Sequence, residues 1–236
     1  MIDAHIHLLP GVDDGSSSME QSLAMARQAA ADGVRRIICT PHMNAEFSPP
    51  DSLDRHASLC AELQAELDRA GIDVRLECGA EWMLTPGLVD IVRERGRLGQ
   101  SRAFLFEVSL FMPVTAAAGI LGDARRAGLR PVLAHPERYP SLSAKDAAVL
   151  GSLAERGCIL QLTAGSLTGA FGRQVRQCSA AIARNFPESI VISSDAHDTE
   201  SRTPVLSAGY AALDKISKGL AEQAQKRLEK LVCPEG

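Results

Sequence analysis

The sequence predicts one α/β domain over residues 1–236, built as a distorted seven-stranded (β/α)7 barrel that resembles a TIM barrel. Three observations predict it: short apolar runs alternate with helical stretches, the 236 residues match the size of one barrel domain, and polar residues follow nearly every apolar run. Strands separated by helices are parallel, and β/α barrels build their active sites at the carboxyl ends of such strands. A doubly wound sheet would instead gather the polar residues at its switch point.

Seven runs rich in Val, Ile and Leu are predicted strands. They cover residues 1–7, 35–40, 73–78, 103–108, 131–134, 158–162 and 189–193. The predicted helices between them cover residues 22–32, 51–70, 115–127 and 143–156. The capping box Ser18-Met19-Glu20-Gln21 precedes the first helix, and a glycine follows each of the four.

Composition limits the classes of function. The net charge of −4 gives no bulk attraction for nucleic acid or an anionic membrane. No apolar run approaches the ~20 residues of a membrane-spanning helix, so no membrane insertion is expected. The six cysteines form no C-x-x-C pair and mostly lie among apolar residues, which is typical of core thiols in a reducing compartment. A cytoplasmic protein is expected, and its oligomeric state stays open.

Metal-ligand chemistry stands at the predicted strand ends. Five of the six histidines are there, and the sixth, His56, is interpreted as a solvated helix residue. Two residues apart on a strand, His5 and His7 point to the same face and can bind one ion together. The set of candidate donors comprises His5, His7, Asp14, His42, Glu81, Glu107, His135, Asp195 and His197.

Nine donors exceed the four to six ligands, roughly, of a single ion, so two or three ions are expected. Imidazole and carboxylate without thiolate suit Mn, Zn or Fe. Clustered divalent ions activate water for in-line displacement at phosphorus, which predicts a phosphate ester as substrate. Arg138 and Arg202 lie close in sequence to His135 and His197, and a guanidinium can neutralise phosphoryl oxygens bidentately.

A family resemblance runs from residue 1 to about residue 212. The motifs that carry it are His5-x-His7, Asp13-Asp14-Gly15, Thr40-Pro41-His42, Gly79-Ala80-Glu81, Phe106-Glu107, His135-Pro136-Glu137-Arg138-Tyr139 and Ser194-Asp195-Ala196-His197. Together they resemble the polymerase and histidinol phosphatase (PHP) superfamily. They are most similar to its bacterial capsule and exopolysaccharide branch, the manganese-dependent protein-tyrosine phosphatases.

The resemblance implies a role for each motif residue. One ion would be held by His5, His7, Glu81 and Asp195, a second by His42, His135 and the shared Glu81, and a third by Asp14, Glu107 and His197. Arg138 and Arg202 would bind the phosphate, and a hydroxide held by the ions would attack phosphorus. The ions are expected to be Mn²⁺. The implied partner is the phosphotyrosine tail of a membrane-associated bacterial tyrosine kinase that controls polysaccharide assembly.

Two departures from the family and one competing motif are present. Thr163 stands where relatives commonly carry asparagine, and an expected Asn-Pro element is absent after Lys218, which leaves the last helix in question. Cys178 and Arg184 match the C-x5-R spacing of cysteine-dependent phosphatases. The residues between them are helix formers without glycine, so the phosphate-binding loop of that mechanism is not expected.

Two other functions stay open. One is a small-molecule phosphoesterase of the same superfamily, acting on histidinol phosphate or a nucleotide. The other is a metal-stabilised regulatory module without turnover. Nine donors and two arginines argue against the regulatory module, because structural metal sites are closed and need fewer ligands.

Overall fold

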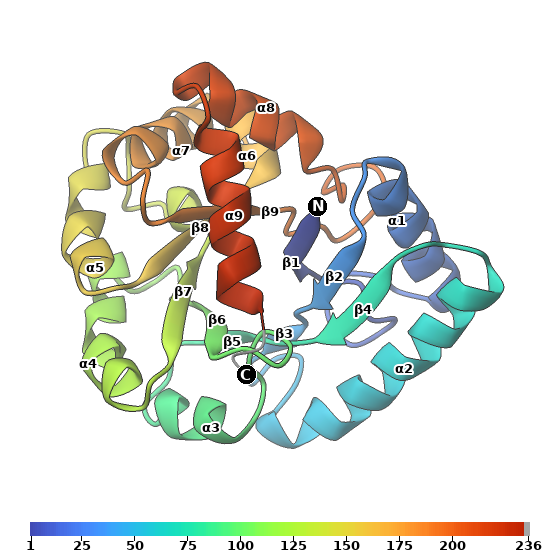
Figure 1. Ribbon diagram of the computed structural model, residues 1–236. Coiled ribbons are helices and arrows are strands. Elements are labelled where there is room, and N and C mark those ends of the chain that lie inside the picture. Colours follow the sequence, from blue (N-terminus) through green and yellow to red (C-terminus); the bar gives the residue numbers. More distant parts are fainter. Residues whose placement is uncertain (234–236) are drawn as a thin grey trace.

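Strands and helices alternate along the chain in the computed structural model, which describes residues 1–233 (Figure 1). The last three residues of the predicted domain lie outside this description. The strands are β1 (Ile2–Ile6), β2 (Arg36–Cys39), β3 (His42–Met43), β4 (Arg75–Cys78), β5 (Glu81–Met83), β6 (Ala103–Glu107), β7 (Arg130–Ala134), β8 (Ile159–Thr163) and β9 (Ile190–Ser193).

The helices lie around the strands in Figure 1. They are α1 (Met19–Ala31), α2 (Leu53–Arg69), α3 (Leu88–Glu94), α4 (Ala118–Arg126), α5 (Gly151–Glu155), α6 (Ala164–Thr168), α7 (Arg173–Asn185), α8 (Ser207–Ile216) and α9 (Leu220–Val232). Short 3₁₀ turns are η1 (Pro50–Ser52), η2 (Val114–Ala117), η3 (Pro136–Arg138) and η4 (Ala147–Leu150).

All paired strands are parallel, which confirms the predicted α/β class. In residues 1–233 they form two sheets, ordered β1-β2-β4 and β3-β5-β6-β7-β8-β9. Each of the seven predicted runs contains a strand, but the strands do not form one closed seven-stranded ladder. A single parallel bridge, Ile6 to Ala196, joins the end of β1 to the chain after β9.

The two additional strands, β3 and β5, lie just beyond the ends of two predicted strands. Thr40 and Pro41 separate β2 from β3, and Gly79 and Ala80 separate β4 from β5. Proline has no N–H for the ladder, and glycine weakens a strand. Hydrogen bonds still cross the interruption, from Gly79 N–H to Cys39 O at 2.8 Å and from Glu81 N–H to the Pro41 carbonyl at 3.0 Å.

Helix α9 covers the amino ends of the strands. Its Leu228, Leu231 and Val232 pack in one cluster with strand residues that include Leu105 and Val191. Arg227 donates to the carbonyl of Ile190 at the start of β9, and Arg36 at the start of β2 donates to the carbonyl of Val232. The last helix is therefore present, and the site lies at the opposite, carboxyl ends.

Two local predictions are wrong. The helix predicted for residues 143–156 is instead a turn followed by η4 and the short α5, because Ser143 N–H and Oγ both donate to Asp146 and form a turn. His56 is buried rather than solvated, with its Nε2 3.3 Å from Ser48 Oγ. No helix in the described part of the chain is long and apolar enough to cross a membrane.

Candidate metal centre

The nine predicted donors come together at the carboxyl ends of the strands. They are supplied by strands β1, β3, β5 and β6 and by the segments that follow β1, β7 and β9. Parallel strands bring residues that are far apart in sequence to one edge of the sheet. His5 and Asp195 can therefore contact the same ion although they lie at opposite ends of the chain.

The first predicted ligand set is compact and fully buried. His5 Nε2 lies 3.3 Å from Glu81 Oε2 and 3.4 Å from Asp195 Oδ1. His7 Nε2 lies 3.4 Å from Glu81 Oε2 and 3.6 Å from Asp195 Oδ1. The four side chains thus direct their ligand atoms to one point.

Glu81 also joins the second set. One of its oxygens, Oε2, lies 3.0 Å from His42 Nδ1, and the other, Oε1, lies 2.9 Å from His135 Nε2. Since a carboxylate can bridge two ions, Glu81 is placed to be shared between the first and second sets.

The third predicted set is only partly brought together. Asp14 Oδ1 lies 3.3 Å from His197 Nε2 and 3.4 Å from His42 Nε2, and these residues form one possible ligand group with His7. Glu107 does not group with Asp14 and His197: its Oε1 lies 3.4 Å from His42 Nδ1, and it groups with His42 and Glu81. The arrangement therefore shifts Glu107 toward the second predicted set.

Two ligand candidates have left-handed backbones. His135 has a φ of 33° and Asp195 a φ of 51°, although neither is glycine. This backbone conformation costs about 1–3 kcal/mol for each residue that is not glycine, and it persists only where the surrounding structure enforces it. The Asp195 N–H donates to the His5 carbonyl at 2.8 Å, and the His135 carbonyl accepts from the Arg138 N–H at 2.9 Å.

Three supporting residues were missed as functional groups by the sequence analysis. Gln161 Oε1 lies 2.8 Å from His5 Nδ1, and Asp13 Oδ2 lies 2.7 Å from His7 Nδ1, so both Nε2 atoms face the cluster. Gly15 lets the acidic turn close onto His7, because a Cβ there would lie 2.3 Å from His7 Cβ. Only the sequence Asp13-Asp14-Gly15 signalled any of them.

Four buried polar atoms of the cluster make no well-aligned hydrogen bond among the described residues, although ion-pair partners lie close to them. They are Glu81 Oε2, His42 Nδ1, Asp195 Oδ1 and His197 Nε2. A buried polar atom without a well-aligned hydrogen bond is costly, and divalent cations bound by these side chains would offset that cost. The donors are imidazole and carboxylate, which suits Mn, Zn or Fe. The residues present therefore fit a metal centre.

The electrostatics of the cluster favour cations. Burial opposes the charged forms of His5 and His42, yet nearby carboxylates outweigh it. Glu81 and Asp195 raise the pKa of His5 to about 9, and Glu81 with Glu107 raises the pKa of His42 to about 11. Protons and divalent cations compete for such a field.

Both predicted arginines converge on Asp195. Arg202 Nη2 lies 2.6 Å from Asp195 Oδ1, and Arg138 Nη1 pairs with Asp195 Oδ2. The guanidinium of Arg138 also lies over the ring of Phe171, 4.6 Å from its centroid, which fixes its direction. Both arginine side chains stay about one-quarter exposed and can meet a ligand (27% and 23%).

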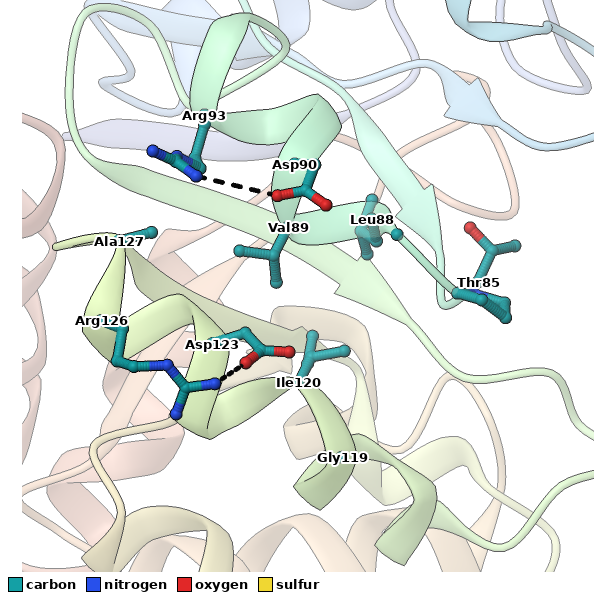
Figure 2. Close-up of a pocket in the computed structure, with 12 residues that line it drawn as sticks. Thr85, Leu88, Val89, Asp90, Arg93, Gly119, Ile120, Asp123, Arg126 and Ala127 are labelled. Atoms are coloured by element: carbon teal, nitrogen blue, oxygen red, sulfur yellow. Dashed lines mark hydrogen bonds and ion pairs between the residues drawn. The ribbon is translucent and has the colours of Figure 1, made fainter.

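A groove elsewhere on the molecule does not carry this chemistry. Figure 2 shows the cavity of about 540 Å³ between α3 and α4. Its charged residues pair within their own helices, Asp90 with Arg93 and Asp123 with Arg126. None of its lining residues is a predicted ligand, so the candidate site is the cluster at the strand ends.

The competing cysteine motif lies in a helix, as predicted. Cys178 is a buried residue of α7, and burial raises the pKa of its thiol to about 12. It therefore has neither the phosphate-binding loop nor the thiolate of a cysteine-dependent phosphatase. At the family departure, the Thr163 N–H donates to Glu137 Oε1 at 2.8 Å, while Thr163 Oγ1 has no partner in residues 1–233.

The fold and the cluster together define the class: α/β proteins that gather imidazole and carboxylate ligands for divalent ions at the carboxyl ends of parallel strands. Residues 1–230 match the family model described as capsular polysaccharide synthesis, CpsB/CapC. The chain belongs to this family.

Named relatives and a solved structure agree. The chain is 31% identical over 207 residues to the tyrosine-protein phosphatase YwqE of Bacillus subtilis, covering 86% of this chain and 79% of the relative. It is 29% identical to the tyrosine-protein phosphatase CpsB of Streptococcus pneumoniae, covering 97% and 94%. A structure described under "YwqE from Bacillus subtilis and CpsB from Streptococcus pneumoniae, unique metal-dependent tyrosine phosphatases" has a TM-score of 0.89 at 28% identity, covering 100% of this chain and 96% of that chain.

Proposed function

We propose that this protein is a metal-dependent protein-tyrosine phosphatase of capsular or exopolysaccharide synthesis. Its substrate is the phosphotyrosine tail of a membrane-associated bacterial tyrosine kinase. The observation that carries the proposal is the cluster of five histidines and four carboxylates, six of them buried, beside two converging arginines. The names of the relatives YwqE and CpsB support tyrosine phosphatase activity.

The metal ions would be held by His5, His7, Glu81 and Asp195, by His42, His135, Glu107 and the shared Glu81, and by Asp14 and His197. When bound, such ions lower the pKa of a coordinated water toward ~7 and neutralise phosphoryl oxygens. We propose two or three ions per chain, with Mn²⁺ preferred over Zn or Fe. Gln161 and Asp13 contact the Nδ1 atoms of His5 and His7, which leaves both Nε2 atoms free to bind an ion.

The chain's own residues bind and orient the phosphate ester. Arg138 and Arg202 offer guanidinium N–H groups toward the oxygens on which charge develops. Phe171 supports the guanidinium of Arg138. The leaving group is a tyrosinate, whose phenol has a pKa of ~10, so it needs less protonation than an alkoxide would. The ligand histidines are therefore not needed as general acids and can remain metal ligands.

We also interpret β2 with β3 and β4 with β5 as two interrupted strands of one distorted seven-stranded barrel. The hydrogen bonds from Gly79 N–H and Glu81 N–H across the interruption support this interpretation. The whole chain then acts as one catalytic domain. A cytoplasmic location stays a prediction from the free cysteines, and the oligomeric state stays open.

The experiment that tests the proposed substrate class compares kcat/KM for a phosphotyrosine peptide, histidinol phosphate and a nucleotide monophosphate, all with Mn²⁺ present. The phosphotyrosine peptide is expected to be the best substrate. Much faster turnover of histidinol phosphate or the nucleotide would identify the protein as a small-molecule phosphoesterase instead. No turnover of any ester by metal-loaded protein would point to a regulatory module.

A further inference from the structure

An apolar loop without an assigned role lies beside the cluster of candidate metal ligands. Leu110, Phe111 and Met112, hereafter the apolar tip, are 62%, 99% and 44% exposed. Three consecutive large apolar side chains in water are unusual for a soluble surface, and such patches mark binding sites. The tip follows directly from β6, whose last residue is the ligand candidate Glu107.

The exposure of the apolar tip is built into the backbone. The Met112 N–H donates to the Ser109 carbonyl at 2.9 Å and closes a turn. Leu110 and Phe111 occupy the two central positions of this turn, and both side chains are largely exposed to solvent.

The base of the loop is attached to the phosphate-binding side of the site. The Val108 N–H donates to Tyr139 Oη at 2.6 Å, and both residues are buried. Tyr139 directly follows Arg138 in the chain. The base of the loop is therefore held between Glu107 and the turn that carries His135 and Arg138, and the apolar tip extends from this base at the rim of the site.

The apolar surface continues past the tip. Pro113 and Val114 line a largely apolar groove of about 380 Å³ together with Leu142 and Val149. Residues 108–115 include no charged side chain. An anionic lipid or an acidic partner therefore finds no complementary charge on this loop, whereas an apolar side chain does.

We propose that the apolar tip binds large apolar side chains that flank the phosphotyrosine of a peptide substrate. This inference rests on the proposed function. A peptide whose phosphotyrosine reaches the metal cluster must carry its neighbouring residues across the rim, and the rim next to Glu107 is this tip. The site therefore selects phosphotyrosine in an apolar sequence over phosphotyrosine in a polar one.

The test uses two phosphotyrosine peptides that differ only at the residues on either side of the phosphotyrosine, leucine in one and serine in the other. Wild-type enzyme should prefer the leucine peptide by about tenfold in kcat/KM, mainly through KM. The double variant Leu110→Ser with Phe111→Ser should lose this preference. Phe111→Leu, which keeps an apolar side chain at the same position, should retain it and is the matched control.

Equal turnover of both peptides by wild-type enzyme would overturn the inference and leave the proposed function standing. Turnover of neither peptide would overturn both. Two further measurements on the same variants identify other occupants. If the double variant loses binding to phosphatidylglycerol vesicles, or dissociates from a dimer, while the peptide preference is unchanged, the tip is a membrane or self-association surface and the inference is wrong.

Discussion

Asp195 is the residue on which the site depends most. It adopts a left-handed backbone, faces His5 and His7 with one oxygen, and meets both Arg138 and Arg202. A single carboxylate therefore connects the proposed metal ligands to the proposed phosphate ligands. Two arginines from separate segments are thereby held beside one carboxylate, as the proposed joint binding of one phosphoryl group would require.

The arginines give a residue-scale prediction. Arg202→Ala should lower kcat/KM for a phosphotyrosine peptide about 10²–10³-fold, because one donor to the developing charge is lost. Arg202→Lys should restore part of it, since the charge returns without the planar fork. Steady-state kinetics measure the loss, and the metal content of each variant is the control. Full activity in Arg202→Ala, or loss of bound metal as the cause of inactivity, would contradict the assigned role.

At this scale the sequence predicted nine ligand candidates, which the structure brings together at one end of the strands, but it did not predict the residues that support them. Histidine and carboxylate at strand ends are recognisable because few other functions require them there. Gln161 lies within a buried strand, and its contact with His5 depends on pairing between distant strands. The residues around Gln161 in the sequence do not predict that contact. Likewise, Ser48 faces His56 only after the chain folds, so its burial was not predicted.

At the scale of elements, β1 is fastened to the segment after β9. Asp3 is fully buried and accepts hydrogen bonds from the N–H and the hydroxyl of Ser194. The adjacent bridge between Ile6 and Ala196 continues the same contact. Together these interactions position His5 and Asp195 opposite each other.

Asp3 gives a pH prediction for this fastening. Burial raises the pKa of Asp3 to about 6, from an ordinary value of 3.8. Between these values the folded protein holds the proton more strongly than the unfolded chain, so stability present below pH 4 should be lost as the pH rises through 6. Asp3→Asn should remove up to about 3 kcal/mol of this pH dependence. The measurement is the free energy of unfolding by denaturant at pH 4 and pH 7, in both proteins.

An equal loss of stability between pH 4 and pH 7 in wild type and Asp3→Asn would contradict this assignment. The difference between the two proteins isolates the contribution of Asp3 from those of all other ionisable groups, which the two proteins share.

The elements themselves were predicted where periodicity was long enough to read. The strand of residues 103–108 and the helix after Ser18 are such cases, and Ser18 accepts from the Gln21 N–H as the capping motif requires. The strands β3 and β5 were missed because two or three residues after a proline or glycine leave no alternating pattern. The interruptions after β2 and β4, which are followed by strands that begin with His42 and Glu81, could therefore not be predicted from the sequence.

On the scale of the whole molecule, the two ends of the strands have separate tasks. Helix α9 packs across the amino ends and contributes to the core, whereas the carboxyl ends carry the ligands. Stability and chemistry are thus assigned to opposite faces, as is general for parallel strands wrapped by helices. The class of fold followed from the order of elements, but the division into two sheets follows from tertiary pairing.

The most direct test of the central claim is the release of phosphate from a phosphotyrosine peptide before chelation, after chelation and after Mn²⁺ is restored. Wild type and Cys178→Ser should both lose activity on chelation and regain it with Mn²⁺, and His42→Ala should stay inactive throughout. Activity that survives chelation and His42→Ala but disappears in Cys178→Ser would contradict the metal-dependent mechanism.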